Sequence, residues 1–170
     1  LGDTAHGYYS KQDPFGKKGD FVTAPEVSQV FGELLGLWGL DFWMKSGPWA
    51  EFNLVELGPG RGTLMRDIAH SVKMHPAYLQ SAHLHLLETS PVLQEKQNQT
   101  LSKVLGDTTP CHWHTNINDL LKACHGMPVI IYANEFFDAL PIRQFVQENG
   151  MWKLKGCLLY TSDAADDPTC

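Results

Sequence analysis

The sequence predicts an α/β fold built on a doubly wound, mostly parallel, Rossmann-like sheet. Segments with strand and helix patterns alternate along the chain, which is typical of such folds. An apolar strand at 52–57 runs through a glycine-rich turn into a helix, as strands do where a parallel sheet binds a ligand. The run at 129–133 is apolar and rich in β-branched residues, which indicates a central parallel strand.

Residues 1–50 are expected to form an N-terminal loop and a capping helix. The helix is predicted to begin at Thr23, because Pro25 lies in its first turn and Glu26 follows at capping-box spacing. Apolar residues then recur every three or four positions, which predicts one core-directed face. That face comprises Val27, Val30, Phe31, Leu34, Leu35 and Trp38.

Residues 51–155 are predicted to form a partial α/β core. After the first strand, the patterns predict a helix at 63–72, a strand at 84–87, a helix from Ser90-Pro91 toward Leu105, a strand at 112–114, a helix at 118–123, a strand at 129–133 and a β-hairpin at 144–154. Residues 156–170 break this style and resemble translated sequencing-adapter read-through. We interpret them as a non-native tail.

Composition excludes several classes of protein. A net charge of −6 argues against general binding to nucleic acid or to anionic membranes. No apolar run approaches membrane-spanning length, so no membrane insertion is expected. The 4 cysteines show no Cys-x-x-Cys spacing, which favours a reducing compartment.

The glycine-rich turn is the strongest indication of a ligand. Gly58, Gly60 and Gly62 alternate, so a ligand can approach the backbone closely. The spacing departs from Gly-x-Gly-x-x-Gly, because Thr63 stands where a dinucleotide motif continues. Glu56 before the turn would repel a pyrophosphate but suits a cationic ligand. The pattern is similar to the first motif of class I S-adenosyl-L-methionine (SAM) methyltransferases, with a ligand-free tight turn as the alternative.

Residues that end the next two strands complete a predicted cofactor site. Glu88 is expected to accept both ribose hydroxyls through its two oxygens. The alternative is an acid that merely favours the start of the following helix. Trp113 and His114 are candidates for the adenine edge, with a partly buried core tryptophan as the alternative.

The segment after the fourth strand is a candidate for catalysis. Asn134, Glu135 and Asp138 gather polar groups beside Phe136 and Phe137. If the methyl acceptor is a guanidinium group, carboxylates such as Glu135 and Asp138 can orient it and remove its proton. The alternative is that Asn134 and Asp138 only cap the following turn.

Four separated motifs together resemble the MidA-like family of SAM-dependent methyltransferases. They are Gly19-Asp20-Phe21-Val22-Thr23-Ala24-Pro25-Glu26-Val27-Ser28, Phe31-Gly32-Glu33, the stretch from Val55 to Leu64, and Asn134-Glu135-Phe136-Phe137-Asp138-Ala139-Leu140-Pro141. The resemblance implies a class I methyltransferase fold, SAM as the cofactor and protein arginine as the methyl acceptor. It also implies that the chain lacks the C-terminal part of the family's fold.

The resemblance implies roles for the residues of this chain that match the family's motifs. Glu56, Gly58, Pro59, Gly60 and Gly62 correspond to the SAM loop, Glu88 to the ribose acid, and Asn134-Glu135 to the motif after strand four. The segment at 19–28 is expected to close over the pocket. Because the family's mitochondrial member supports assembly of respiratory complex I, one candidate acceptor is a complex I subunit. The implied location is the bacterial cytoplasm or the mitochondrial matrix.

Three other readings are open to test. A non-catalytic assembly or chaperone module could retain the fold and pocket. A nicotinamide- or flavin-dependent oxidoreductase is disfavoured by the glycine spacing. A metal site is not expected, because the same-strand pairs His83/His85 and His112/His114 have no third ligand at a suitable spacing.

Overall fold

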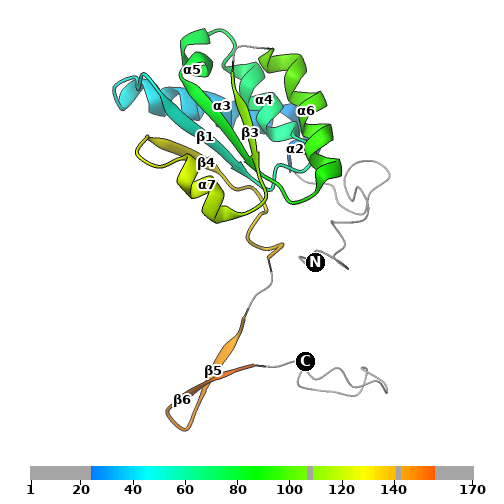
Figure 1. Cartoon of the computed structure of the whole chain (residues 1–170), viewed down its shortest axis with the longest axis vertical. Coiled ribbons are helices and arrows are strands. Elements are labelled where there is room, and N and C mark those ends of the chain that lie inside the picture. The colour runs from blue at the N-terminus through cyan, green and yellow to red at the C-terminus, as the bar shows by residue number, and fades with distance from the viewer. Residues whose placement is uncertain (1–23, 107–108, 141–142, 156–170) are drawn as a thin grey trace. The chain divides into compact units, whose positions relative to one another are not determined.

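A four-stranded parallel sheet organises the larger of two units, in the spatial order β3-β2-β1-β4 (Figure 1). The computed structural model describes residues 24–106, 109–140 and 143–155. The strands are β1 (Phe52–Leu57), β2 (Ala82–Leu87), β3 (Cys111–His114) and β4 (Val129–Tyr132). The chain moves outward from β1 to β3 and then crosses to β4 on the other side of β1. The predicted doubly wound parallel sheet is confirmed, and such sheets bind ligands at the carboxyl ends of the strands beside this reversal.

Helices cover both faces of the sheet, and Figure 1 shows α7 on the opposite side from α4 and α6. The helices are α2 (Ala24–Val27), α3 (Gln29–Lys45), α4 (Thr63–Ser71), α5 (Pro76–Gln80), α6 (Pro91–Leu105) and α7 (Ile117–Ala123). Phe52 and Leu54 of β1 belong to the larger core, while Val55 and Leu57 pack in a second cluster with Leu120 of α7. β1 is therefore buried on both faces, as a central parallel strand should be.

Local sequence explains the helix starts that the patterns predicted. Pro91 opens α6, and the Ser90 hydroxyl accepts a hydrogen bond from the backbone N–H of Leu93 at 3.4 Å. Asn116 caps α7 by accepting from the N–H of Asp119 at 2.9 Å. The short helix α5 was not predicted from the sequence.

The packing face of α3 differs from the prediction. Val30, Leu34 and Trp38 are 56%, 62% and 56% exposed, whereas the buried positions are Gly32, Gly36, Gly39, Leu40 and Trp43. Phe31 and Leu35 do pack partly against the core. The physical reason is close approach: a Cβ at Gly32 would lie 2.6 Å from Asp67 Cβ of α4. The glycines, not the large apolar side chains, let α3 contact α4.

The fourth strand lies at the edge of the described sheet, although its apolar run was predicted to be central. Ile130 and Tyr132 point into the core, while Val129 and Ile131 are 38% and 56% exposed. Among the described residues β4 pairs with β1 alone. Because only one face of β4 is buried, every second residue of this apolar run is exposed to solvent.

The predicted β-hairpin is confirmed and belongs to the second unit, which starts at Leu140. Its strands are β5 (Phe145–Glu148) and β6 (Met151–Leu154), paired antiparallel. Asn149 and Gly150 connect them with φ values of 52° and 77°. These left-handed values fit the Asn-Gly sequence of a tight hairpin turn.

Four predictions fall wholly or partly outside the described residues: the N-terminal loop, the helix cap at Thr23, the part of the closing segment at 19–23, and the non-native tail at 156–170. Within the described ranges, no helix is both long and apolar enough to cross a membrane.

Candidate functional site

The glycine turn follows β1 directly and has a strongly bent backbone. Gly58, Gly60 and Gly62 have φ values of 65°, 56° and 78°, which disfavour any residue with a side chain. The N–H of Gly62 donates to the carbonyl of Pro59 at 2.8 Å and closes the turn. Gly62 also precedes the first turn of α4 without a side-chain cap. The turn therefore needs glycine at these three positions to keep its backbone conformation.

Glu56 lies beneath this turn and is almost completely buried, at 3% exposure. Its carboxyl group accepts a hydrogen bond from the backbone N–H of Met65 in α4, while Oε2 has no partner among the described residues. Burial raises the pKa of Glu56 to about 8. The acid thus holds a proton at neutral pH unless a cation comes close to it.

Glu88 follows β2 at the same edge of the sheet. Backbone bonds tie the strand ends together: the N–H of Gly58 donates to Leu87 O at 3.1 Å, and that of Glu88 to His114 O at 2.9 Å. Glu88 Oε1 accepts from the N–H of Ser90 at 2.8 Å, and burial raises its pKa. The N–H of Thr89 and the amide of Gln97 also donate to this carboxylate, which has about four acceptor sites, so it keeps capacity for a further donor such as a ribose hydroxyl.

Gln97 of α6 is part of this site and was missed by sequence reasoning. It is 0% exposed, and its amide contacts both Gly60 and Glu88. A signal was present in the sequence. Leu93, Gln97, Leu101 and Leu105 recur every four residues and form the buried face of α6, so a glutamine stands at a core position.

Trp113 and His114 lie on opposite sides of β3. Trp113 packs against the larger core and donates from Nε1 to Gln97 Oε1 at 2.9 Å. His114 instead contacts His85 on the other face, with 2.9 Å between Nε2 and Nδ1. Of the two adenine candidates, the structure brings Trp113 into the network around Glu88 and gives His114 different partners.

The segment after β4 approaches the glycine turn through Phe136. A Cβ on Gly58 would lie 2.8 Å from Phe136 Cδ2. Glu135 is exposed and has a φ of 49°, an unusual backbone conformation for a residue with a side chain. Asn134 is half-buried and Asp138 is exposed. The structure therefore brings the two sequence motifs together and leaves both carboxylates accessible.

Part of the N-terminal motif also reaches the turn. The Thr63 hydroxyl, at the start of α4, donates to Glu26 Oε1 at 2.8 Å. Glu26 thus contacts the helix that follows the glycines. Asp20 and Thr23 lie outside the described residues.

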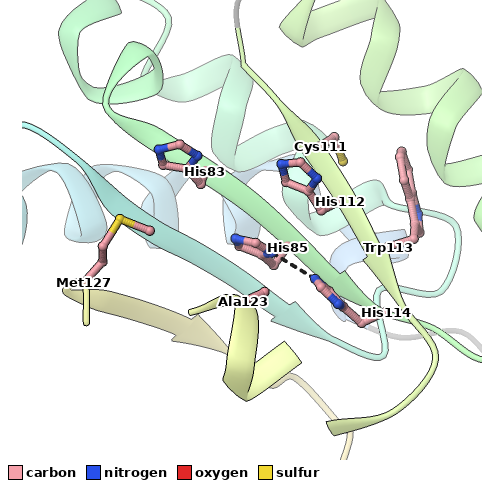
Figure 2. A pocket seen from close by; sticks show the side chains of 8 residues that line it. All are labelled: His83, His85, Cys111, His112, Trp113, His114, Ala123 and Met127. Carbon is pink, nitrogen blue, oxygen red and sulfur yellow. Dashed lines mark hydrogen bonds between the residues drawn. The ribbon is translucent and has the colours of Figure 1, made fainter. Parts of the chain in front are cut away.

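A cavity of about 520 Å³ lies beside the histidines of β2 and β3 (Figure 2). It is lined by His83, His85, Cys111, His112, Trp113, His114, Ala123 and Met127. Burial and neighbouring imidazoles lower the pKa of His85 to about 4, and its Nε2 lies 3.0 Å from Asn53 Oδ1. Among the described residues, no three or more His, Cys, Asp or Glu side chains are arranged to hold a metal ion. The cavity lining includes neither Glu56 nor Glu88.

Comparison with known proteins assigns the chain to a family. A family model described as "Putative S-adenosyl-L-methionine-dependent methyltransferase" matches residues 34–166. The chain belongs to this family. The Drosophila melanogaster protein arginine methyltransferase NDUFAF7 homolog, mitochondrial, is 37% identical over 180 residues, covering 95% of this chain and 40% of the relative. The human protein arginine methyltransferase NDUFAF7, mitochondrial, is 38% identical over 172 residues, covering 90% and 38%. The chain thus spans about two fifths of the length of these relatives.

Solved structures share the fold of this methyltransferase family member. A COG1565 superfamily protein from Burkholderia thailandensis, crystallised with S-adenosyl-homocysteine, superposes with a TM-score of 0.69 at 24% identity. The match covers 91% of this chain and 38% of that one. A second structure from the same organism gives a TM-score of 0.59.

Proposed function

We propose that this protein binds SAM at the carboxyl ends of β1 and β2 and transfers the methyl group to an arginine side chain of a protein. Family membership supports the reaction class. The observation that best supports this location is that the Gln97 amide donates hydrogen bonds to both Gly60 of the glycine turn and the buried Glu88. It lies at the edge of the sheet where doubly wound folds bind ligands.

The groups present fit this cofactor. Glu88 would accept the ribose hydroxyls, and the indole of Trp113 would border the adenine. The turn at 58–62 offers backbone for close approach of the methionine part. Glu56 Oε2, which has no partner in the part of the chain that the structure describes, is a buried acceptor that a nearby positive charge would favour in its ionised form.

The segment after β4 supplies groups for the transfer. Bound SAM provides a methyl group on a positively charged sulfur. A guanidine nitrogen that loses its proton to a carboxylate would form the new bond to this carbon, and the carbon–sulfur electron pair would stay on the sulfur. Glu135 and Asp138 would orient the guanidinium through paired hydrogen bonds and accept its proton. Phe136, which packs against Gly58, would keep these carboxylates beside the cofactor.

The names of the relatives support the substrate class. Two of them are called protein arginine methyltransferases and mitochondrial, which favours a protein acceptor and makes the mitochondrial matrix one candidate location. The bacterial cytoplasm is the other. A respiratory complex I subunit is the specific acceptor that we propose.

One experiment separates this function from its alternatives. The full-length gene product is incubated with methyl-labelled SAM and a lysate of cells that lack the gene. A labelled protein band, with methylarginine found by mass spectrometry, supports the proposal. Measurable SAM binding without any labelled band favours an assembly module, and binding of NAD in place of SAM favours an oxidoreductase.

Replacing Glu88 tests the ribose contact. Glu88→Ala is expected to weaken SAM binding about tenfold, because hydrogen bonds to a charged group are lost. Calorimetry measures the affinity, and thermal unfolding checks that the fold is retained. Glu95→Ala, at an exposed site of the following helix α6, is the matched control. Unchanged affinity in a folded Glu88→Ala protein removes Glu88 from the ribose role.

Replacing Glu135 tests the transfer step. Glu135→Gln is expected to leave SAM affinity unchanged and to slow methyl transfer about 100-fold, the range of a positioned general base. Single-turnover transfer from labelled SAM measures the rate. Asp138→Asn in the same assay shows whether the two acids share the role, and an undiminished rate in both variants places the base elsewhere.

A further inference from the structure

Gln97 joins three parts of the candidate site with one amide group. Its Nε2 donates to Gly60 O at 2.7 Å and to Glu88 Oε2 at 3.1 Å, and its Oε1 accepts from Trp113 Nε1 at 2.9 Å. The side chain is completely buried. A turn, an acid and an aromatic ring from three separate segments are therefore held by one residue.

The partners dictate the type and the orientation of this side chain. A backbone carbonyl only accepts and an indole N–H only donates, so the amide nitrogen must face Gly60 and the oxygen must face Trp113. The second amide hydrogen then points to Glu88. Glutamate cannot donate twice, lysine cannot accept, and methionine offers no N–H donor. Among side chains of this length, glutamine alone satisfies all three partners.

Close packing fixes the backbone of this residue as well. A Cβ on Gly62 would lie 3.4 Å from Gln97 Cα and 3.5 Å from its Cγ. α6 itself begins with the Ser90 cap, and Gln94 Nε2 donates to the backbone carbonyl of Glu88 at 2.8 Å. Hydrogen bonding to Glu88 therefore fixes the start of α6, and this helix places the Gln97 amide against the glycine turn.

We propose that Gln97 is a positioning residue, which holds the Glu88 carboxylate, the Gly60 carbonyl and the Trp113 indole in the arrangement that receives the adenosine part of SAM. The proposal rests on the function proposed above. Gln97 acts through its three partners. It sets the direction in which Glu88 offers its oxygens to the ribose.

The test uses the full-length gene product and S-adenosylhomocysteine, with affinity measured by calorimetry from pH 5 to pH 8. Gln97→Met is expected to weaken binding about tenfold at every pH, the size of a lost bond to a charged partner. Gln97→Glu is expected to bind better at pH 5 than at pH 8, although Gly60 O lacks its amide donor at every pH. At high pH two carboxylates face each other there, whereas at low pH a shared proton joins them.

Two further variants separate the role of Gln97 from a general effect of added charge and from a loss of folding. Gln99→Glu makes the same change of charge at an exposed site of α6 and should follow the wild-type pH profile. Trp113→Phe removes the bond to Gln97 Oε1 together with part of the indole surface and should weaken binding at least about threefold, a variant that serves if Gln97→Met fails to fold. A Gln97→Glu profile equal to that of wild type, or full affinity in folded Gln97→Met, overturns the inference alone. If the wild-type protein does not bind S-adenosylhomocysteine, both the proposed function and this inference are wrong.

Discussion

Gly36→Val is expected to lower the free energy of unfolding by about 3 kcal/mol, the upper end of the usual cost of overpacking a core. A Cβ at this position would overlap Ser71 Oγ and lie 2.8 Å from the carbonyl oxygen of Ile68. The serine hydroxyl can rotate away, but the backbone of α4 cannot. α3 must then move outward from α4, and the contacts of Leu40 and Trp43 with the core are loosened.

Thermal and denaturant unfolding measure this loss. For a chain of this size, about 3 kcal/mol corresponds to a fall in melting temperature of roughly 6–12 °C. Leu37→Ala, at a position of α3 that is 48% exposed, is the control and should change stability little. Equal melting temperatures for Gly36→Val and wild type would show that α3 does not pack on α4 through its glycines.

Glu56→Gln is expected to stabilise the ligand-free protein by about 4 kcal/mol at pH 8 and to remove most of its pH dependence above pH 6.5. Burial raises the pKa of Glu56 from 4.5 to about 8 in the folded state. Between these values the folded chain keeps a proton that the unfolded chain releases, so stability falls as pH rises through this window. The fall is at most about 1.4 kcal/mol per pH unit.

His85 produces the opposite slope at lower pH. Its pKa falls from 6.5 to about 4 on folding, so the unfolded chain binds the extra proton and stability rises with pH between these values. The two effects oppose each other below pH 6.5, and Glu56 dominates from pH 6.5 to 8. Urea unfolding at several pH values measures the slope, with Glu95→Gln as the exposed control. A Glu56→Gln protein with the wild-type slope would falsify this assignment.

Much of the fold could be predicted because its signals are local. Ser90 before Pro91 starts α6, Asn149-Gly150 turns the hairpin, and the glycines after Leu57 bend the backbone. Each of these depends on the conformational preference of one or two residues. The family motifs likewise lie in short segments, so Glu56, Glu88 and Asn134-Glu135 were found as candidates before their positions in space were known. Their roles toward SAM stay predictions.

Other features depend on contacts between distant segments. Periodicity assigned the large apolar residues of α3 to the core, but Gly32 and Gly36 permit a closer approach to α4, and Val30, Leu34 and Trp38 stay exposed. The spacing of Leu93, Gln97 and Leu101 places Gln97 on the buried face of α6, but its carbonyl, carboxylate and indole partners come from distant segments. Trp113 and His114, neighbours in the sequence, were separated by the alternation of side chains along a strand.

The sequence by itself determined the order of strands and helices, the glycine turn and the acids that surround it. Those properties follow from backbone preferences and from short motifs. The tertiary structure alone decided which helix face is buried, that Glu56 holds a proton at neutral pH, and that Gln97 links the turn to Glu88. Desolvation and hydrogen-bond complementarity depend on atoms brought together from distant parts of the chain, and no local pattern contains them.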